Sequence, residues 1–127
     1  MTTTQPLRAL PANSIAIARK KLAAKQGYRC PLCTGTLATG KPALDHCHVT
    51  GHVRATLCQS CNVGEGKVMA AMLFRTAKNN MAYTDPVSWL RNLADYLEYH
   101  KSNPSGLIHP TFDLRTGKQL PVKRKKR

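Results

Sequence analysis

Two Cys-x-x-Cys pairs constrain the fold of this chain more than any other feature of its sequence. Cys30 pairs with Cys33 and Cys58 with Cys61, and 24 residues separate the two pairs. Two such pairs are typical of a tetrahedral zinc site. The first residues show no secretory signal, so we expect a reducing compartment, which disfavours disulfides. Redox-active pairs and a disulfide framework are the alternatives to zinc.

The composition gives a reason for a structural metal. Of the 127 residues, 42% are apolar but only 6% are aromatic, so a modest core must rest on aliphatic side chains and on something extra. A structural zinc ion contributes on the order of 10 kcal/mol to folding. No apolar run approaches the roughly 20 residues that span a bilayer, so no transmembrane segment is expected.

The charge points to a polyanionic partner. Lysine and arginine number 20 against six acidic residues, which gives a net charge of +14. DNA or RNA is the leading candidate, and an acidic membrane surface is the second. The third possibility is that the charge serves only to keep the protein soluble. Lys118 and the run Lys123–Arg127 place six cations in the last ten residues. We expect this basic end to be disordered and to add sequence-independent affinity for phosphate.

The placement of prolines, glycines and basic runs divides the chain into three predicted parts. These are a flexible terminus at residues 1–11, a zinc-stabilised domain at 12–101 and an extended basic arm at 102–127. Caps and periodicity predict a small α+β domain that is mostly helical. The expected elements are a helix capped by Asn13 or Ser14 and stopped by Gly27, strands at 43–46 and 53–57, a helix following Cys61, and a helix running from Pro86 to about His100 with Asp85 as its cap.

Three polar residues between and beside the cysteine pairs carry the candidate chemistry. Asp45 and His46 lie in the first predicted strand, and Asn62 directly follows Cys61. The zinc ion would clamp both ends of this segment and bring the three side chains together. Carboxylate and amide oxygens suit a hard cation such as Mg²⁺, and an imidazole suits a general base. Asp45 and Asn62 are therefore the expected oxygen ligands.

The order of these motifs resembles a known family. Cys-x-x-Cys, Leu-Asp-His-x-His, Gly-x-x-Arg and Leu-Cys-x-x-Cys-Asn follow one another, over about residues 28–66, as in the recombination endonuclease VII family of phages. That family belongs to the HNH-type nucleases. The resemblance implies a ββα-metal finger clamped by a four-cysteine zinc site, with flanking helices, inside an intertwined homodimer.

The resemblance also implies a role for each matched residue. Cys30, Cys33, Cys58 and Cys61 would bind structural zinc, and Asp45 and Asn62 would bind catalytic Mg²⁺ or Mn²⁺. His46 would be the general base, and His48 would contact or polarise the scissile phosphate. Glu65 would tune the site. The chemistry of phosphodiester hydrolysis adds Arg54 as a candidate clamp on a nonbridging oxygen.

Structural alternatives stand beside these roles. The histidines could be additional zinc ligands or ordinary surface residues, Asp45 could be a turn residue, Asn62 could cap its helix, and Glu65 could be a helix N-terminal charge. Cys47 is expected to be a small buried filler. In an ideal strand Asp45 and His46 point to opposite faces, so one shared site requires the strand to end or kink there.

Two functions compete at this stage. The leading one is a Mg²⁺-dependent endonuclease that hydrolyses DNA, either selectively at branched DNA or by nicking duplexes. Paired cuts in a branched substrate would require two active sites and therefore a homodimer. The alternative is a non-catalytic zinc protein that binds nucleic acid as a regulator. In either case we expect an intracellular protein, in the host cytoplasm if a phage encodes it.

Overall fold

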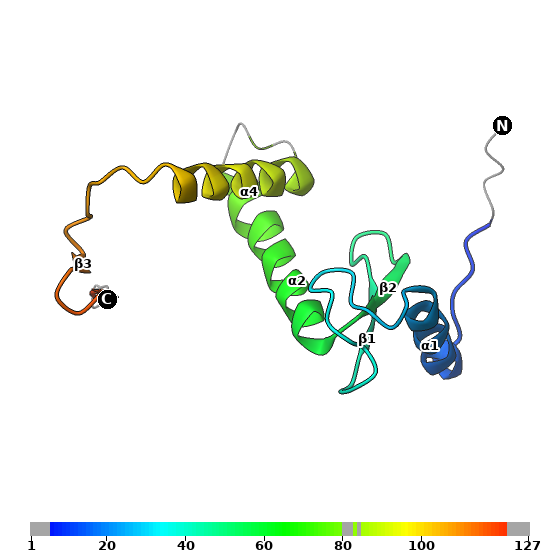
Figure 1. Cartoon of the computed structure of the whole chain (residues 1–127). Coiled ribbons are helices and arrows are strands. Elements are labelled where there is room, and N and C mark those ends of the chain that lie inside the picture. The colour runs from blue at the N-terminus through cyan, green and yellow to red at the C-terminus, as the bar shows by residue number, and fades with distance from the viewer. Residues whose placement is uncertain (1–5, 80–82, 84, 122–127) are drawn as a thin grey trace. The chain divides into compact units, whose positions relative to one another are not determined.

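The computed structural model describes residues 6–79, 83 and 85–121 (Figure 1). The chain divides into two compact units, Met1–Tyr83 and Thr84–Arg127. The first five residues of the predicted flexible terminus and the basic run Lys123–Arg127 lie outside the described residues.

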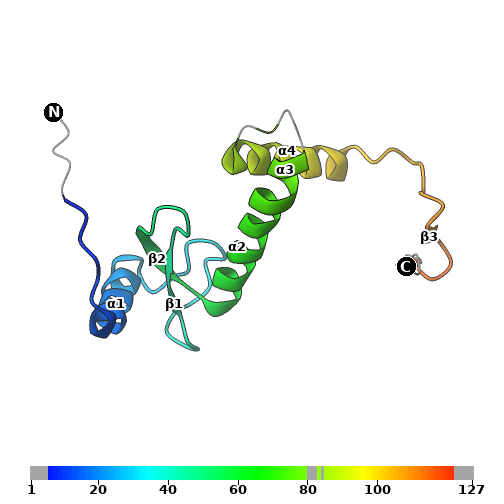
Figure 2. The same ribbon diagram turned by 180° about the vertical axis from the view of Figure 1, so that it is seen from behind.

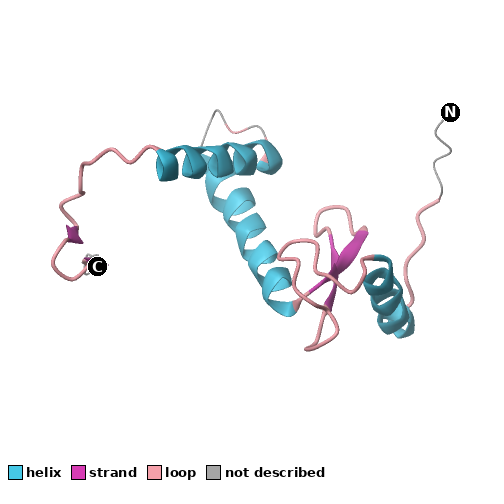
Figure 3. Cartoon of the chain, viewed as in Figure 1, coloured by secondary structure: helices cyan, strands magenta, loops and turns pink. Residues whose placement is uncertain are grey.

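The predicted α+β fold class is confirmed, because helices account for most of the regular structure and a small antiparallel hairpin accompanies them (Figure 3). The first unit contains a 3₁₀ turn at Ala12–Ser14, α1 at Ile15–Lys25, β1 at Ala43–His46, β2 at Val53–Leu57 and α2 at Gln59–Ala71, which continues through a π-helical segment at Met72–Thr76 into α3 at Ala77–Asn79. The second unit contains α4 at Pro86–Ser102, β3 at Phe112–Asp113 and β4 at Lys118–Gln119.

Helix α1 ends as predicted but begins differently. Gly27 adopts a φ of 63°, the left-handed conformation that stops a helix at low cost when the residue is glycine. At the other end, Ser14 makes no side-chain capping hydrogen bond. The 3₁₀ turn at Ala12–Ser14 leads into the helix instead, so the expected side-chain cap is wrong.

The pairing of β1 with β2 is irregular at Asp45. Leu44 pairs with Thr56 and His46 pairs with Val53, so two residues of β2, Arg54 and Ala55, lie opposite the single residue Asp45. Such a β-bulge bends the strand and redirects a side chain. The extra residue belongs to β2, so β2 is the strand that bends, and β1 ends at His46, directly after Asp45.

Helix α1 is fastened to the hairpin through Thr56, whose side chain is fully buried. The Gln26 amide donates to the Thr56 carbonyl at 2.8 Å and accepts from the Thr56 N–H at 2.9 Å. The Thr56 hydroxyl donates to the Arg19 carbonyl at 2.7 Å. The hairpin thus lies between α1 and α2 (Figures 1 and 2).

The apolar core of the first unit is very small. Among the described residues, the buried apolar side chains are Ala23, Cys30, Leu37, Leu57 and Met72. Four of these form one cluster with Cys58 and Cys61 packed against it. The expectation of a modest aliphatic core is confirmed, and Cys30 lies in this core while Cys58 and Cys61 pack against it.

In the second unit, α4 begins as predicted. The Asp85 carboxylate accepts a hydrogen bond from the Ser88 N–H at 2.9 Å, and Pro86 occupies the first turn. The strands β3 and β4 form a short antiparallel hairpin after it. Within the described part of the chain, every helix is too short or too polar to cross a bilayer.

Replacing Thr56 by valine tests the α1–hairpin contact. The variant keeps the shape of the side chain but removes the hydroxyl that the Arg19 carbonyl accepts from. We expect it to lower the free energy of unfolding by about 1–3 kcal/mol, the usual cost of leaving a buried polar group without its partner. Chemical denaturation of the zinc-loaded chain measures the change. Thr39→Val, at an exposed position, is the control, and equal stabilities of the two variants would contradict this account.

Candidate metal centres and histidine pair

The four paired cysteines converge on one point. One sulfur from each of Cys30, Cys33, Cys58 and Cys61 lies within 4.8 Å of all the others. The Cys33 and Cys58 sulfurs are 3.8 Å apart. Sulfurs at the vertices of a tetrahedron ~2.3 Å from a zinc ion are themselves ~3.8 Å apart. The donor set therefore fits a structural zinc ion, as the spacing of the cysteines predicted.

The local backbone shapes both halves of this cluster. In the first half, the Thr34 N–H donates to the Cys30 carbonyl at 2.8 Å and closes a tight turn, with Thr34 at a positive φ of 64°. The next residue is Gly35, and a glycine suits this position because a Cβ there would lie only 3.3 Å from the Cys33 sulfur. In the second half, the Cys58 sulfur caps α2 by accepting from the Cys61 N–H.

The protonation behaviour of the thiols also favours a cation. Burial alone would raise the pKa of the Cys30 thiol, but hydrogen bonds from the backbone of Cys33 and Cys58 outweigh it and lower the pKa to about 6. Contacts with the Cys58 and Cys33 thiols raise the pKa of Cys61 to about 12. A thiolate therefore forms easily at Cys30, whereas ionisation of Cys61 is disfavoured unless a metal compensates its charge.

A second charged cluster links the hairpin to α2. Arg54 binds Asp45 through two contacts, Nε to Oδ2 at 2.7 Å and Nη2 to Oδ1 at 2.9 Å. The same Nη2 contacts Glu65 Oε1 at 2.9 Å. The Asp45 carboxylate is the main reason that the pKa of Arg54 is raised above its ordinary value. Arg54, expected to face a phosphate, here pairs with two carboxylates.

Asn62 lies on the same helix face as Glu65. Helix α2 begins at Gln59 with Cys58 as its cap, so Asn62 is inside the first turn and the alternative that it caps the helix is wrong. Residues three apart on a helix are neighbours on one face. Asn62 therefore shares its helix face with Glu65, whose carboxylate contacts Arg54 of the hairpin.

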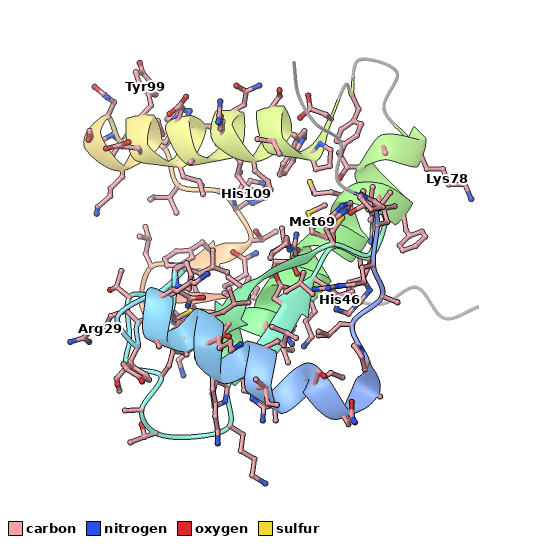
Figure 4. The ribbon with its side chains drawn as sticks, turned by 90° about the vertical axis from the view of Figure 1, so that its right-hand side faces the viewer. Arg29, His46, Met69, Lys78, Tyr99 and His109 are labelled. Carbon is pink, nitrogen blue, oxygen red and sulfur yellow. The ribbon has the colours of Figure 1, made fainter. Side chains whose placement is uncertain are left out.

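His46 and His48 form a stacked pair at the end of the hairpin. Their ring centroids are 4.6 Å apart and the rings are inclined by 7°. Both side chains are exposed, whereas Asp45 is buried. The metal-binding cluster found among the described residues contains cysteines alone, so the histidines are not additional zinc ligands. In Figure 4, His46 lies on the opposite side of the first unit from Arg29, the neighbour of Cys30.

Cys47 lies between the two histidines. It was expected to be a small buried residue because it belongs to neither Cys-x-x-Cys pair, and that expectation is wrong. Its side chain is half-buried. Hydrogen bonds from the Thr50 hydroxyl and from the backbone of Thr50 and Val49 lower the pKa of its thiol. The turn that brings Thr50 back onto Cys47 is closed by the Gly51 N–H, which donates to the Cys47 carbonyl at 2.7 Å. The pairing of these two residues follows from the turn and is not visible in the sequence pattern.

Comparison with known families agrees with this geometry. The family model of recombination endonuclease VII matches residues 8–99, nearly three quarters of the chain. The match includes the cysteine cluster, the hairpin, α2 and most of α4. It extends the resemblance on either side of residues 28–66.

Replacing Cys58 by serine tests the zinc site. The variant loses one ligand and the sulfur that caps α2, so we expect it to lose stoichiometric zinc and the cooperative unfolding of the first unit. Metal content by mass spectrometry and a thermal melt followed by circular dichroism measure both effects. Cys47→Ser is the matched control and should retain one zinc ion per chain. A Cys58→Ser protein that is zinc-free and melts like the wild type would refute the assignment.

Proposed function

Since the chain belongs to the recombination endonuclease VII family and is a DNA endonuclease, we propose that it hydrolyses phosphodiester bonds with Mg²⁺ or Mn²⁺ held beside a histidine base. The observation that supports this most directly is that the Asp45 and Glu65 carboxylates, from β1 and α2, contact one guanidinium, while His46, directly after Asp45, stacks on His48. Nucleic-acid binding alone does not need such a set.

Asp45 and Asn62 would hold the divalent ion, and Glu65 is close enough to Asp45 to adjust the charge of the site. Carboxylate and amide oxygens fit Mg²⁺, which takes one or two protein ligands and fills its other positions with water and phosphate oxygens. When bound, the ion would stabilise the negative charge that develops on the phosphate and on the leaving oxygen.

The histidine pair would supply the proton chemistry. In this proposal His46 accepts a proton from the attacking water, a task that imidazole performs well near neutral pH. His48 contacts the scissile phosphate. Two exposed rings with centroids 4.6 Å apart would both reach one phosphodiester group, which supports these roles.

The charge of the chain supports DNA as the substrate. A net charge of +14 attracts the phosphate backbone independently of sequence. We further propose that the enzyme acts at branched DNA or nicks duplexes, and that paired cuts are made by a homodimer with two active sites. The free thiols of the zinc cluster fit the reducing interior of a cell.

Replacing His46 by alanine tests the catalytic proposal. General-base catalysis typically contributes ~10²–10⁴-fold, so we expect Mg²⁺-dependent nicking of supercoiled plasmid to fall by about that factor. Zinc content and DNA affinity should stay at wild-type values. His109→Ala, in the second unit, is the control and should cut normally. Equal background cleavage by wild type and His46→Ala would favour the alternative, a non-catalytic zinc protein that binds nucleic acid.

A substrate comparison tests the preference for branched DNA. Cleavage rates on a four-way junction, a nicked duplex and a plain duplex of the same length are measured with Mg²⁺ under single-turnover conditions. We expect the junction to be cut fastest, with paired incisions from one binding event, because two active sites would act on one substrate. Equal rates on the junction and the plain duplex would remove the preference but leave the endonuclease activity intact.

A further inference from the structure

We propose that Arg54 is an internal counter-cation that occupies the acidic side chains of the divalent-ion site and must leave Asp45 before the ion binds. This inference rests on the metal site proposed above. It makes Arg54 a positioning residue that sets the metal affinity of the enzyme.

The contacts of Arg54 cover the ligands that a divalent ion would need. Both oxygens of Asp45 are engaged, by Nε at 2.7 Å and by Nη2 at 2.9 Å. Nη2 also reaches Glu65 Oε1 at 2.9 Å. The pairing of the two strands sets Arg54 and Ala55 together opposite Asp45.

A divalent ion cannot simply be added to this arrangement. The Asp45 side chain is only 7% exposed, so no open side of the carboxylate is available to an ion that keeps part of its water shell. A guanidinium in direct contact with the same carboxylate also repels a second cation strongly in a partly buried site. The ion and Arg54 therefore compete for Asp45.

Arg54 is well placed to move. Its side chain is 39% exposed, so the guanidinium can turn toward solvent while Asp45 stays buried. Without a metal, the Arg54 guanidinium neutralises the buried Asp45 carboxylate. It also lies between Asp45 and the like charge of Glu65. The protein would thus exchange one cation for another at Asp45, and this buried carboxylate would stay paired in both states.

Manganese binding without DNA tests this competition. Free Mn²⁺ is measured by electron paramagnetic resonance during titration of the full-length, zinc-loaded chain. Mn²⁺ is a poor competitor for thiolate ligands, so the cysteine cluster should not take it up. We expect Arg54→Gln to lower the dissociation constant by roughly tenfold or more, since a like charge at the shared carboxylate is removed. Asp45→Asn is the control that should abolish binding.

A second variant and a second readout address folding. Arg54→Lys keeps the charge but cannot form the two-point contact with Asp45, so its affinity should fall between those of wild type and Arg54→Gln. Arg54→Gln should melt at a lower temperature than wild type in the absence of Mn²⁺, and saturating Mn²⁺ should raise its melting temperature by a larger amount. If Arg54→Gln fails to fold, tighter binding by Arg54→Lys still supports the proposal.

The outcomes separate the two proposals. Mn²⁺ binding that depends on Asp45 but is unchanged or weakened in both Arg54 variants would overturn the competition and leave the metal site standing. Arg54 would then be a residue that orients Asp45 as a ligand. A failure of wild type and both variants to bind Mn²⁺ would overturn the metal site, and the competition with it.

Discussion

Coordination by four thiolates is the constraint on which the rest of the first unit depends. The buried apolar side chains are too few to hold α1, the hairpin and α2 together by themselves, and the cluster of Ala23, Cys30, Leu37 and Leu57 is continuous with Cys58 and Cys61. A zinc ion at that point joins the segment after α1 to the end of β2 and the start of α2. The hydrophobic core and the metal site are therefore one structure, and loss of the metal would remove the larger share of its stability.

The same coordination positions the candidate catalytic groups. Cys58 caps α2 and Cys61 lies in its first turn, so a zinc ion bound by these cysteines would fix where the helix begins and which way it faces. Asn62 directly follows Cys61, and Glu65 is one turn further on the same face. The hairpin contacts α2 through β1, and its bulge lies opposite Asp45. On its other side, hydrogen bonds between Gln26 and Thr56 join the hairpin to the end of α1. A shift in the start of α2 would move both of its oxygen side chains together.

The features that the sequence revealed are those encoded by short spacings. The cysteine pairs indicated the zinc cluster, Gly27 and Asp85 marked helix ends, and both strands of the hairpin were predicted with the bounds that the structure has. The features that the sequence could not reveal depend on the register in which β1 and β2 pair. The way the two strands pair sets the bulge and brings Arg54 opposite Asp45, while Glu65 comes from a separate helix. Cys47 and Ser14 were misjudged for a similar reason, because a turn and a 3₁₀ segment settled their surroundings. The catalytic roles of the histidines and of Asn62 stay predictions.

The electrostatics of the chain explain why a guarded acidic site is useful. The sequence has six acidic residues against 20 lysines and arginines, and two of the six contact the same guanidinium. Asp45, Glu65 and Arg54 together carry a net charge of about −1, which opposes an approaching phosphate. A divalent ion that replaces Arg54 there would bring the net charge of the ion and the two carboxylates to about zero. If Arg54 yields Asp45 to the ion, loading would remove this opposition to the phosphate, while the basic residues of the chain attract DNA at all times. Binding of the ion and close approach of the scissile phosphate are then thermodynamically coupled, and each strengthens the other by the same factor.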